Sequence, residues 1–167
     1  MKPSWDRLFR IADAQEGHFT TAQAARAGYS PQLLRRHLLA GRIRRVRRSI
    51  YRLVHYPEGD HGDLVALWLW AGGAGVYSHR TALVLHGLAP ESRSAPAHLT
   101  LPSAWAARRL RVPAGLVLHH ADLPAADWGW HGPVRVTTPE RSLRDCAAAG
   151  APKRGPRPTY PDRSGTR

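Results

Sequence analysis

The densest group of chemically capable side chains is a run of arginines between residues 42 and 52. Six of these eleven residues are arginine, in the order RIRRVRRSIYR. A guanidinium group stays charged near neutral pH, and its planar set of donors matches phosphate oxygens and the guanine edge. The run therefore favours a polyanionic partner, with nucleic acid as the first candidate.

The positive charge is unevenly distributed along the 167 residues, whose formal net charge is +13. Residues 1–56 contain 12 Lys or Arg against 3 Asp or Glu, residues 57–150 contain 8 of each, and residues 151–167 contain 5 against 1. A basic block on one folded part indicates the side that meets a polyanion. Only two of the 25 basic residues are lysines, which fits phosphate binding and a compositional bias of the source genome equally well.

Capping and turn signals predict the elements that must position these arginines. Three segments with apolar residues at helical spacing each follow a residue that can cap a helix, namely Ser4, Thr20 or Thr21, and Ser30. Pro31 also suits the first position of a helix. Residues 18–19 read as a short extended link. We expect three helices, from residue 5 to about Gln15–Gly17, from about residue 21 to Ala27, and from Pro31 to Ala40.

The third of these helices has two chemically different faces. Leucines at 33, 34 and 38 share one side, whereas Gln32, Arg35 and Arg36 point largely elsewhere. Such a pattern is typical of a recognition helix that reads base edges. An ordinary amphipathic helix with a solvated face gives the same pattern, so the next segment has to decide between them.

Residues 42–53 read as two short strands around a turn near Arg48 and Ser49. Apolar residues at 43, 46, 50 and 53 can face a core, and we expect the arginines to face outward. Serine suits the turn if no positive φ is needed there. A basic hairpin after a recognition helix is the wing of a winged helix-turn-helix, which grips phosphates or a minor groove.

The rest of the chain alternates helix and strand signals. We expect an α+β fold class, with an N-terminal winged helix-turn-helix at 1–56 and a small mixed α/β domain at 57–150. The proline-rich, basic residues 151–167 are expected to be disordered. Within 57–150 we predict helices at about 60–71, 79–85 with a Ser78 cap, and 139–149 with a Thr138 cap, and strands at 76–77, 97–101, 110–112, 116–119 and 132–137.

Three blocks resemble the AbiEi-type antitoxins of type IV toxin–antitoxin systems. They are the N-terminal module, the segments 76–83 (VYSHRTAL) and 86–88 (HGL), and the segment 136–146 (VTTPERSLRDC). The similarity spans roughly residues 4–149. It implies a winged-helix domain that represses its own operon and an α+β domain that counters a nucleotidyltransferase-like toxin without forming a stable complex.

The chain departs from this family after the 136–146 block. Relatives continue with further helices, whereas this sequence changes to a Pro- and Arg-rich tail. We therefore expect a truncated C-terminal domain, from a natural truncation or a frameshift. Sequencing the locus for an intact downstream frame tests this expectation.

Other chemistries find little support in the sequence. The lone Cys146 allows no disulfide within the chain, and the ten histidines show no metal-ligand spacing, so we expect structural or surface roles for them. The only lysines are Lys2 and Lys153, which argues against the nuclease found in some relatives. We expect no enzyme, cofactor or metal, and, without a signal peptide, a cytoplasmic location.

These observations predict a transcriptional repressor that binds double-stranded DNA at an operator with inverted repeats. The alternative is a protein-interaction module that binds a toxin or another partner through residues 57–150 and has only non-specific affinity for nucleic acid. The predicted DNA-binding residues are Ser30, Gln32, Arg35, Arg36, Arg42, Arg44, Arg45, Arg47, Arg48, Tyr51 and Arg52.

Overall fold

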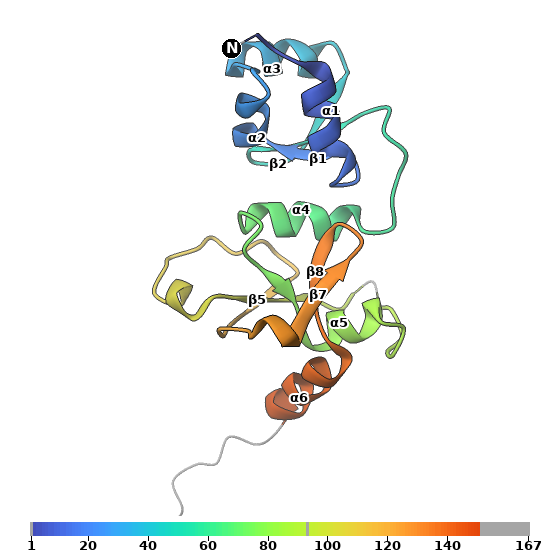
Figure 1. Cartoon of the computed structure of the whole chain (residues 1–167), viewed down its shortest axis with the longest axis vertical. Coiled ribbons are helices and arrows are strands. Elements are labelled where there is room, and N and C mark those ends of the chain that lie inside the picture. The colour runs from blue at the N-terminus through green and yellow to red at the C-terminus, as the bar shows by residue number, and fades with distance from the viewer. Residues whose placement is uncertain (1, 93, 151–167) are drawn as a thin grey trace, which may run out of the picture.

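The computed structural model describes residues 2–92 and 94–150, which form a mixed α+β fold (Figure 1). An N-terminal helical part with a small sheet is followed by a part built on a larger sheet. The fold class predicted from the sequence is therefore confirmed. The tail predicted at 151–167 lies outside the described residues.

The three N-terminal helices begin where their capping residues stand. α1 (Trp5–Asp13) starts after Ser4, whose hydroxyl accepts a hydrogen bond from the backbone N–H of Arg7 at 3.3 Å. α2 (Thr21–Arg26) starts with a capping box formed by Thr20 and Gln23. The local sequence thus determines where both helices start.

The third helix is capped in the same way. α3 (Pro31–Leu39) follows Ser30, whose Oγ accepts a hydrogen bond from the backbone N–H of Leu33 at 3.2 Å. Pro31 occupies the first turn, where its missing N–H costs nothing. The expected third helix is therefore present, one residue shorter than predicted.

A three-stranded antiparallel sheet of order β1-β3-β2 completes the N-terminal part. Its strands are β1 (His18–Thr20), β2 (Ile43–Arg47) and β3 (Ile50–Leu53), with a bulge in β2 before Arg47. The turn between β2 and β3 does need a positive φ, because Ser49 has a φ of 62°. Serine is therefore strained at a position that glycine would occupy without cost.

The second part is a five-stranded mixed sheet of order β6-β5-β4-β8-β7. Strand pairs β4–β8 and β5–β6 are parallel, and β4–β5 and β7–β8 are antiparallel. Its elements are α4 (Gly62–Trp70), β4 (Val76–Tyr77), α5 (His79–Leu85), β5 (Ala97–Leu101), η1 (Ser103–Trp105), β6 (Leu116–His120), η2 (Ala125–Asp127), β7 (Trp128–His131), β8 (Val134–Thr137) and α6 (Pro139–Gly150).

Two hydrophobic clusters meet at the small sheet. One lies between α1–α3 and the sheet and includes Phe19 and Leu34. The other lies around α4 and the five-stranded sheet, yet it also contains Ile50, and Val46 packs against it. Figure 1 shows the strands β1 and β2 between the N-terminal helices and α4. The basic hairpin therefore contributes side chains to both cores.

Three predictions for the second part are wrong. Residues 110–112 form no strand, and residues 128–131, for which no strand was predicted, form β7. β7 exists because it pairs with β8 across a turn at Gly132, a tertiary contact with no strong local signal. Ser78 stands before α5, but its side chain makes no capping hydrogen bond.

The helices of the described residues are short relative to the thickness of a membrane. None of their helices is long and apolar enough to cross a bilayer.

Candidate nucleic-acid interface

The polar face of α3 is uncovered. Leu34 is buried in the N-terminal core, with Leu33 and Leu38 packed beside it. The side chains of Gln32, Arg35 and Arg36 are exposed, as a recognition helix requires. Ser30 is exposed as well, but its hydroxyl oxygen already caps the helix.

Four arginines of the hairpin region are also exposed. Arg42 precedes β2, Arg44 and Arg45 lie on β2, and Arg48 lies in the turn. Arg45 donates a hydrogen bond to the Tyr51 hydroxyl at 3.3 Å, which orients its guanidinium without removing it from solvent. Arg44 also lines a pocket at the junction with the second part. The other three cations lie close to α3 in the chain, so one surface can present them together with the polar face of α3.

The expectation that every hairpin arginine faces outward is wrong for Arg52. This side chain is 4% exposed and donates hydrogen bonds to the carbonyl oxygens of Tyr56 and Pro57, at 3.1 and 2.7 Å. The chain after β3 folds back over the guanidinium, which therefore has a structural role. A phosphate cannot reach it without displacing these contacts.

Two other predicted contact residues are largely enclosed. Tyr51 is 8% exposed and stacks on Phe19, with ring centroids 5.9 Å apart, and its hydroxyl accepts the hydrogen bond from Arg45. Arg47 is partly buried on the part of the hairpin that packs toward the second core. The bulge in β2 and the packing of Val46 explain why strict alternation did not predict this burial.

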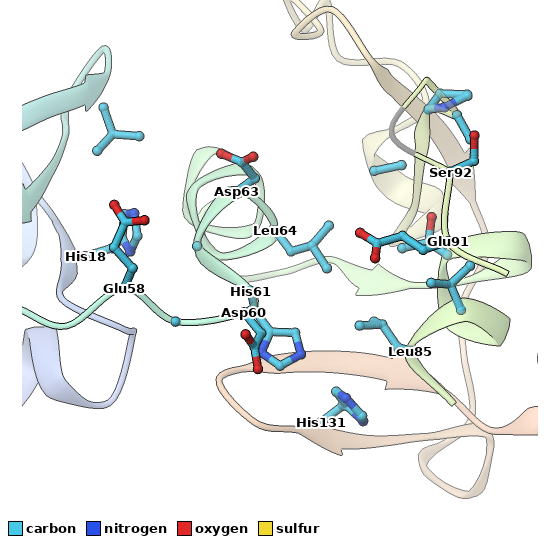
Figure 2. Close-up of a pocket in the computed structure, with 18 of the residues that line it drawn as sticks. His18, Glu58, Asp60, His61, Asp63, Leu64, Leu85, Glu91, Ser92 and His131 are labelled. Atoms are coloured by element: carbon cyan, nitrogen blue, oxygen red, sulfur yellow. The ribbon is translucent and has the colours of Figure 1, made fainter. Parts of the chain in front are cut away.

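A polar pocket of about 880 Å³ lies at the junction of the two parts. Figure 2 shows His18 and Glu58 on one side of it, Leu85, Glu91 and Ser92 on the other, and Asp63 and His131 nearby. Four carboxylates line it together with Arg44, Arg52 and Arg80, so the pocket has no surplus of positive charge and we do not assign it to DNA. The sequence analysis did not predict it, because it forms only when the parts pack together.

One charged contact fixes this junction. Glu16 accepts two hydrogen bonds from His61, at 3.1 Å from the backbone N–H and 3.0 Å from the Nδ1 atom. Glu16 lies before β1, and His61 is the residue that precedes α4. The contact therefore ties the N-terminal part to the start of the second part.

The two downstream sequence blocks meet in space. Tyr77 and Val136 are partners in the parallel pair β4–β8, and the ring of His86 hydrogen bonds to the carbonyl of Thr137 at 2.8 Å. The buried hydroxyls of Thr137 and Ser142 hydrogen bond at 2.7 Å. These residues hold α5 and α6 on the sheet, so the blocks have a packing role in this fold.

The same block contains an ion-pair network. Arg141 bonds Asp127 at 2.7 Å and Asp145 at 2.8 Å, and Arg144 approaches Asp127 at 3.5 Å. Both carboxylates raise the pKa of Arg141, and the largest cause is the hydrogen bond that Arg141 donates to Asp145. This network attaches α6 to η2 and does not create an open catalytic group.

Three histidines that the sequence left apart come together in the second part. Ring nitrogens of His79, His98 and His119 all lie within 4.8 Å of one another. His98 and His119 are 21 residues apart in the chain and lie on the neighbouring strands β5 and β6. Only the pairing of these strands indicates that the two side chains are close.

The matched family covers the N-terminal part. Residues 6–54, from α1 to the end of β3, match the family described as "Transcriptional regulator, AbiEi antitoxin". This is a family of regulators and not of enzymes. No curated protein matches the chain. The resemblance over residues 76–88 and 136–146 stays a prediction. Residues 6–54, which carry α3 and the basic hairpin, are therefore similar to the AbiEi antitoxin transcriptional regulators.

Proposed function

We propose that this protein is a transcriptional repressor that binds the operator of its own operon in the cytoplasm and serves as the antitoxin of a type IV system. The observation that carries the proposal is the uncovered face of α3, where Gln32, Arg35 and Arg36 are exposed beside a basic hairpin. α4 packs on the opposite side of the small sheet, so the second part leaves this face open (Figure 1).

Each group in the proposed interface has a distinct role. Gln32, Arg35 and Arg36 enter the major groove, where bidentate pairs with base edges give sequence discrimination. Exposed arginines of the hairpin, with Arg48 at its tip, bind phosphates and set the register of the protein on the duplex. Arg52 and Tyr51 support the hairpin from inside, so we assign them no direct contact.

The second part acts as the antitoxin portion in this proposal. We place the division between the two parts near residue 56, after β3 and before α4. Its functional partner is a nucleotidyltransferase-like toxin that it counters without forming a stable complex. Co-expression tests this: the chain should relieve growth arrest by the toxin encoded beside it, whereas pull-down should recover no complex.

The decisive test is operator binding by a double variant. Replacing Arg35 and Arg36 by alanine should weaken binding to a duplex from the protein's own promoter by about 100-fold, since each base contact contributes about 1–3 kcal/mol. Fluorescence anisotropy of the labelled duplex, beside a shuffled duplex of equal length, measures the change. The matched control replaces Arg109 and Arg111, two exposed arginines of the second part, and so removes the same charge.

The two outcomes separate the repressor from the interaction module. Equal loss in both double variants, or equal wild-type affinity for operator and shuffled duplex, would show that charge alone drives binding. Affinity should also fall steeply with salt concentration, and Arg48→Ala should reduce the slope of log K against log salt by about 1. Specific binding that disappears only in the α3 variant supports the repressor.

A further inference from the structure

Three imidazole rings from separate elements converge at one side of the five-stranded sheet. His79 is the first residue of α5, His98 lies on β5 and His119 lies on the adjacent β6. One ring nitrogen of each lies within 4.8 Å of the other two, and the side chains are buried or partly buried. Burying three polar rings together is costly unless their nitrogens gain a partner.

The rings are close enough to share one ion. The His79 and His119 centroids are 3.7 Å apart, and His98 Nδ1 lies 2.9 Å from His119 Nε2. A tetrahedral zinc ion with bonds of about 2.0–2.1 Å holds its ligand nitrogens roughly 3.3 Å apart. The rings stack nearly parallel here, with interplanar angles of 17° for His79 and His119 and 15° for His98 and His119. Binding an ion therefore turns the rings and replaces the hydrogen bond between His98 and His119 with bonds to the metal.

A buried hydrogen-bonded chain orients the first ring. Thr100 donates its hydroxyl proton to Ser78 Oγ at 2.7 Å, and Ser78 Oγ lies 2.9 Å from His79 Nδ1. Ser78 is fully buried, and this contact replaces the helix cap predicted for it. A ligating histidine commonly donates its second nitrogen to such an oxygen, which leaves Nε2 for a metal.

The backbone at His79 is strained. Its φ is 53°, in the left-handed region that residues other than glycine rarely occupy. Nothing about starting a helix requires this conformation, and strain of this kind persists at positions where a function needs a fixed side chain. Here the conformation accompanies a ring stacked against His119.

We propose that His79, His98 and His119 form a binding site for a divalent transition-metal ion of the Zn²⁺ class. Three imidazoles without a carboxylate suit zinc and its neighbours and do not suit Mg²⁺ or Ca²⁺. Three protein ligands leave one position for water or another small ligand. A bound ion ties α5 to β5 and β6, away from the face of α3 assigned to DNA.

The protonation state of the rings is compatible with this role. Burial is the main cause that lowers the pKa of all three histidines, and for His119 it lowers the pKa to about 4. The neutral imidazole, which is the ligating form, is therefore present at neutral pH.

The test is metal binding by the untagged full-length chain after treatment with a chelator and dialysis. Calorimetric titration with Zn²⁺ should give one ion per chain with micromolar or tighter affinity, and Co²⁺ should give the visible absorption of a tetrahedral site. His119→Phe keeps the ring stack but removes both nitrogens, so affinity should fall more than about tenfold. His120→Ala changes an exposed neighbour on the same strand and should bind as the wild type does.

Absence of stoichiometric Zn²⁺ binding by the wild type would overturn the proposal, as would equal affinity of the His119 and His120 variants. Far-UV circular dichroism shows whether His119→Phe is folded, and His98→Gln takes its place if it is not. The operator affinity of the folded variant is measured in parallel. Because the site lies outside the DNA interface, that affinity should stay within about twofold of wild type, so a failure of either proposal is recognised separately.

Discussion

At the scale of single residues, burial divides arginines that the sequence made equivalent. Arg44 and Arg52 are cross-strand partners in β2 and β3, yet Arg44 is exposed and Arg52 is 4% exposed. The difference comes from the segment after β3, whose carbonyl oxygens at Tyr56 and Pro57 accept the Arg52 hydrogen bonds. A guanidinium can be desolvated only with such partners, so Arg52 stabilises the fold.

Replacing Arg52 by alanine should therefore destabilise the protein. Loss of the two hydrogen bonds from a charged donor should lower the free energy of unfolding by about 1–3 kcal/mol. Urea denaturation followed by circular dichroism measures the change. The control, Arg48→Ala at the exposed turn, should change stability by less than about 0.5 kcal/mol. Equal effects of the two substitutions would contradict the structural role of Arg52.

At the scale of elements, the hairpin combines a strained turn with a shared core. Ser49 adopts a φ of 62°, and its neighbour Ile50 is buried in the second core. The turn must hold this shape because Ile50 and Val46 are anchored on the side of α4. Packing therefore imposes a conformation for which serine is a poor choice.

Ser49→Gly should raise the free energy of unfolding by about 1 kcal/mol, because glycine adopts the left-handed conformation without the clash of a Cβ atom. Thermal denaturation followed by circular dichroism gives the shift in Tm. Ser94→Gly serves as a control, since Ser94 is exposed and has no positive φ. A lower Tm for Ser49→Gly than for the wild type would show that the strain assigned to this turn is absent.

At the scale of the whole molecule, the three-stranded sheet contributes residues to both hydrophobic cores. Its inner face carries Phe19 and Ile43 toward α1–α3, while Ile50 belongs to the cluster around α4. The contact between Glu16 and His61 closes the same junction. The two parts should therefore unfold together, in a single cooperative transition.

Ile50→Ala tests this coupling, since it removes a fully buried side chain from the three-stranded sheet and should cost about 2–5 kcal/mol. In a Trp5→Phe background every remaining tryptophan lies beyond residue 56, so fluorescence reports the second part while far-UV circular dichroism reports both. The two unfolding curves should coincide and shift together. Leu39→Ala, at a side chain 77% exposed, is the neutral control, and separate transitions would rule out coupling.

Sequence alone determined the elements whose signals are local. The caps at Ser4, Thr20 and Ser30 set the helix starts, and alternation around Arg48 and Ser49 set the hairpin. Helical periodicity also predicted the exposed face of α3, because the leucines share one side of the helix and that side must face the core. Fold class and the basic N-terminal part were therefore readable from the chain.

Only the tertiary structure decided which of these groups are accessible and which distant groups meet. The burial of Arg52, the pairing that makes β7 a strand and the convergence of His79, His98 and His119 depend on packing between segments far apart in sequence. Periodicity reports which face of an element is apolar, but it does not report what covers the other face. The arginine run was thus determined by sequence, and the division of its members between the surface and the interior was determined by the fold.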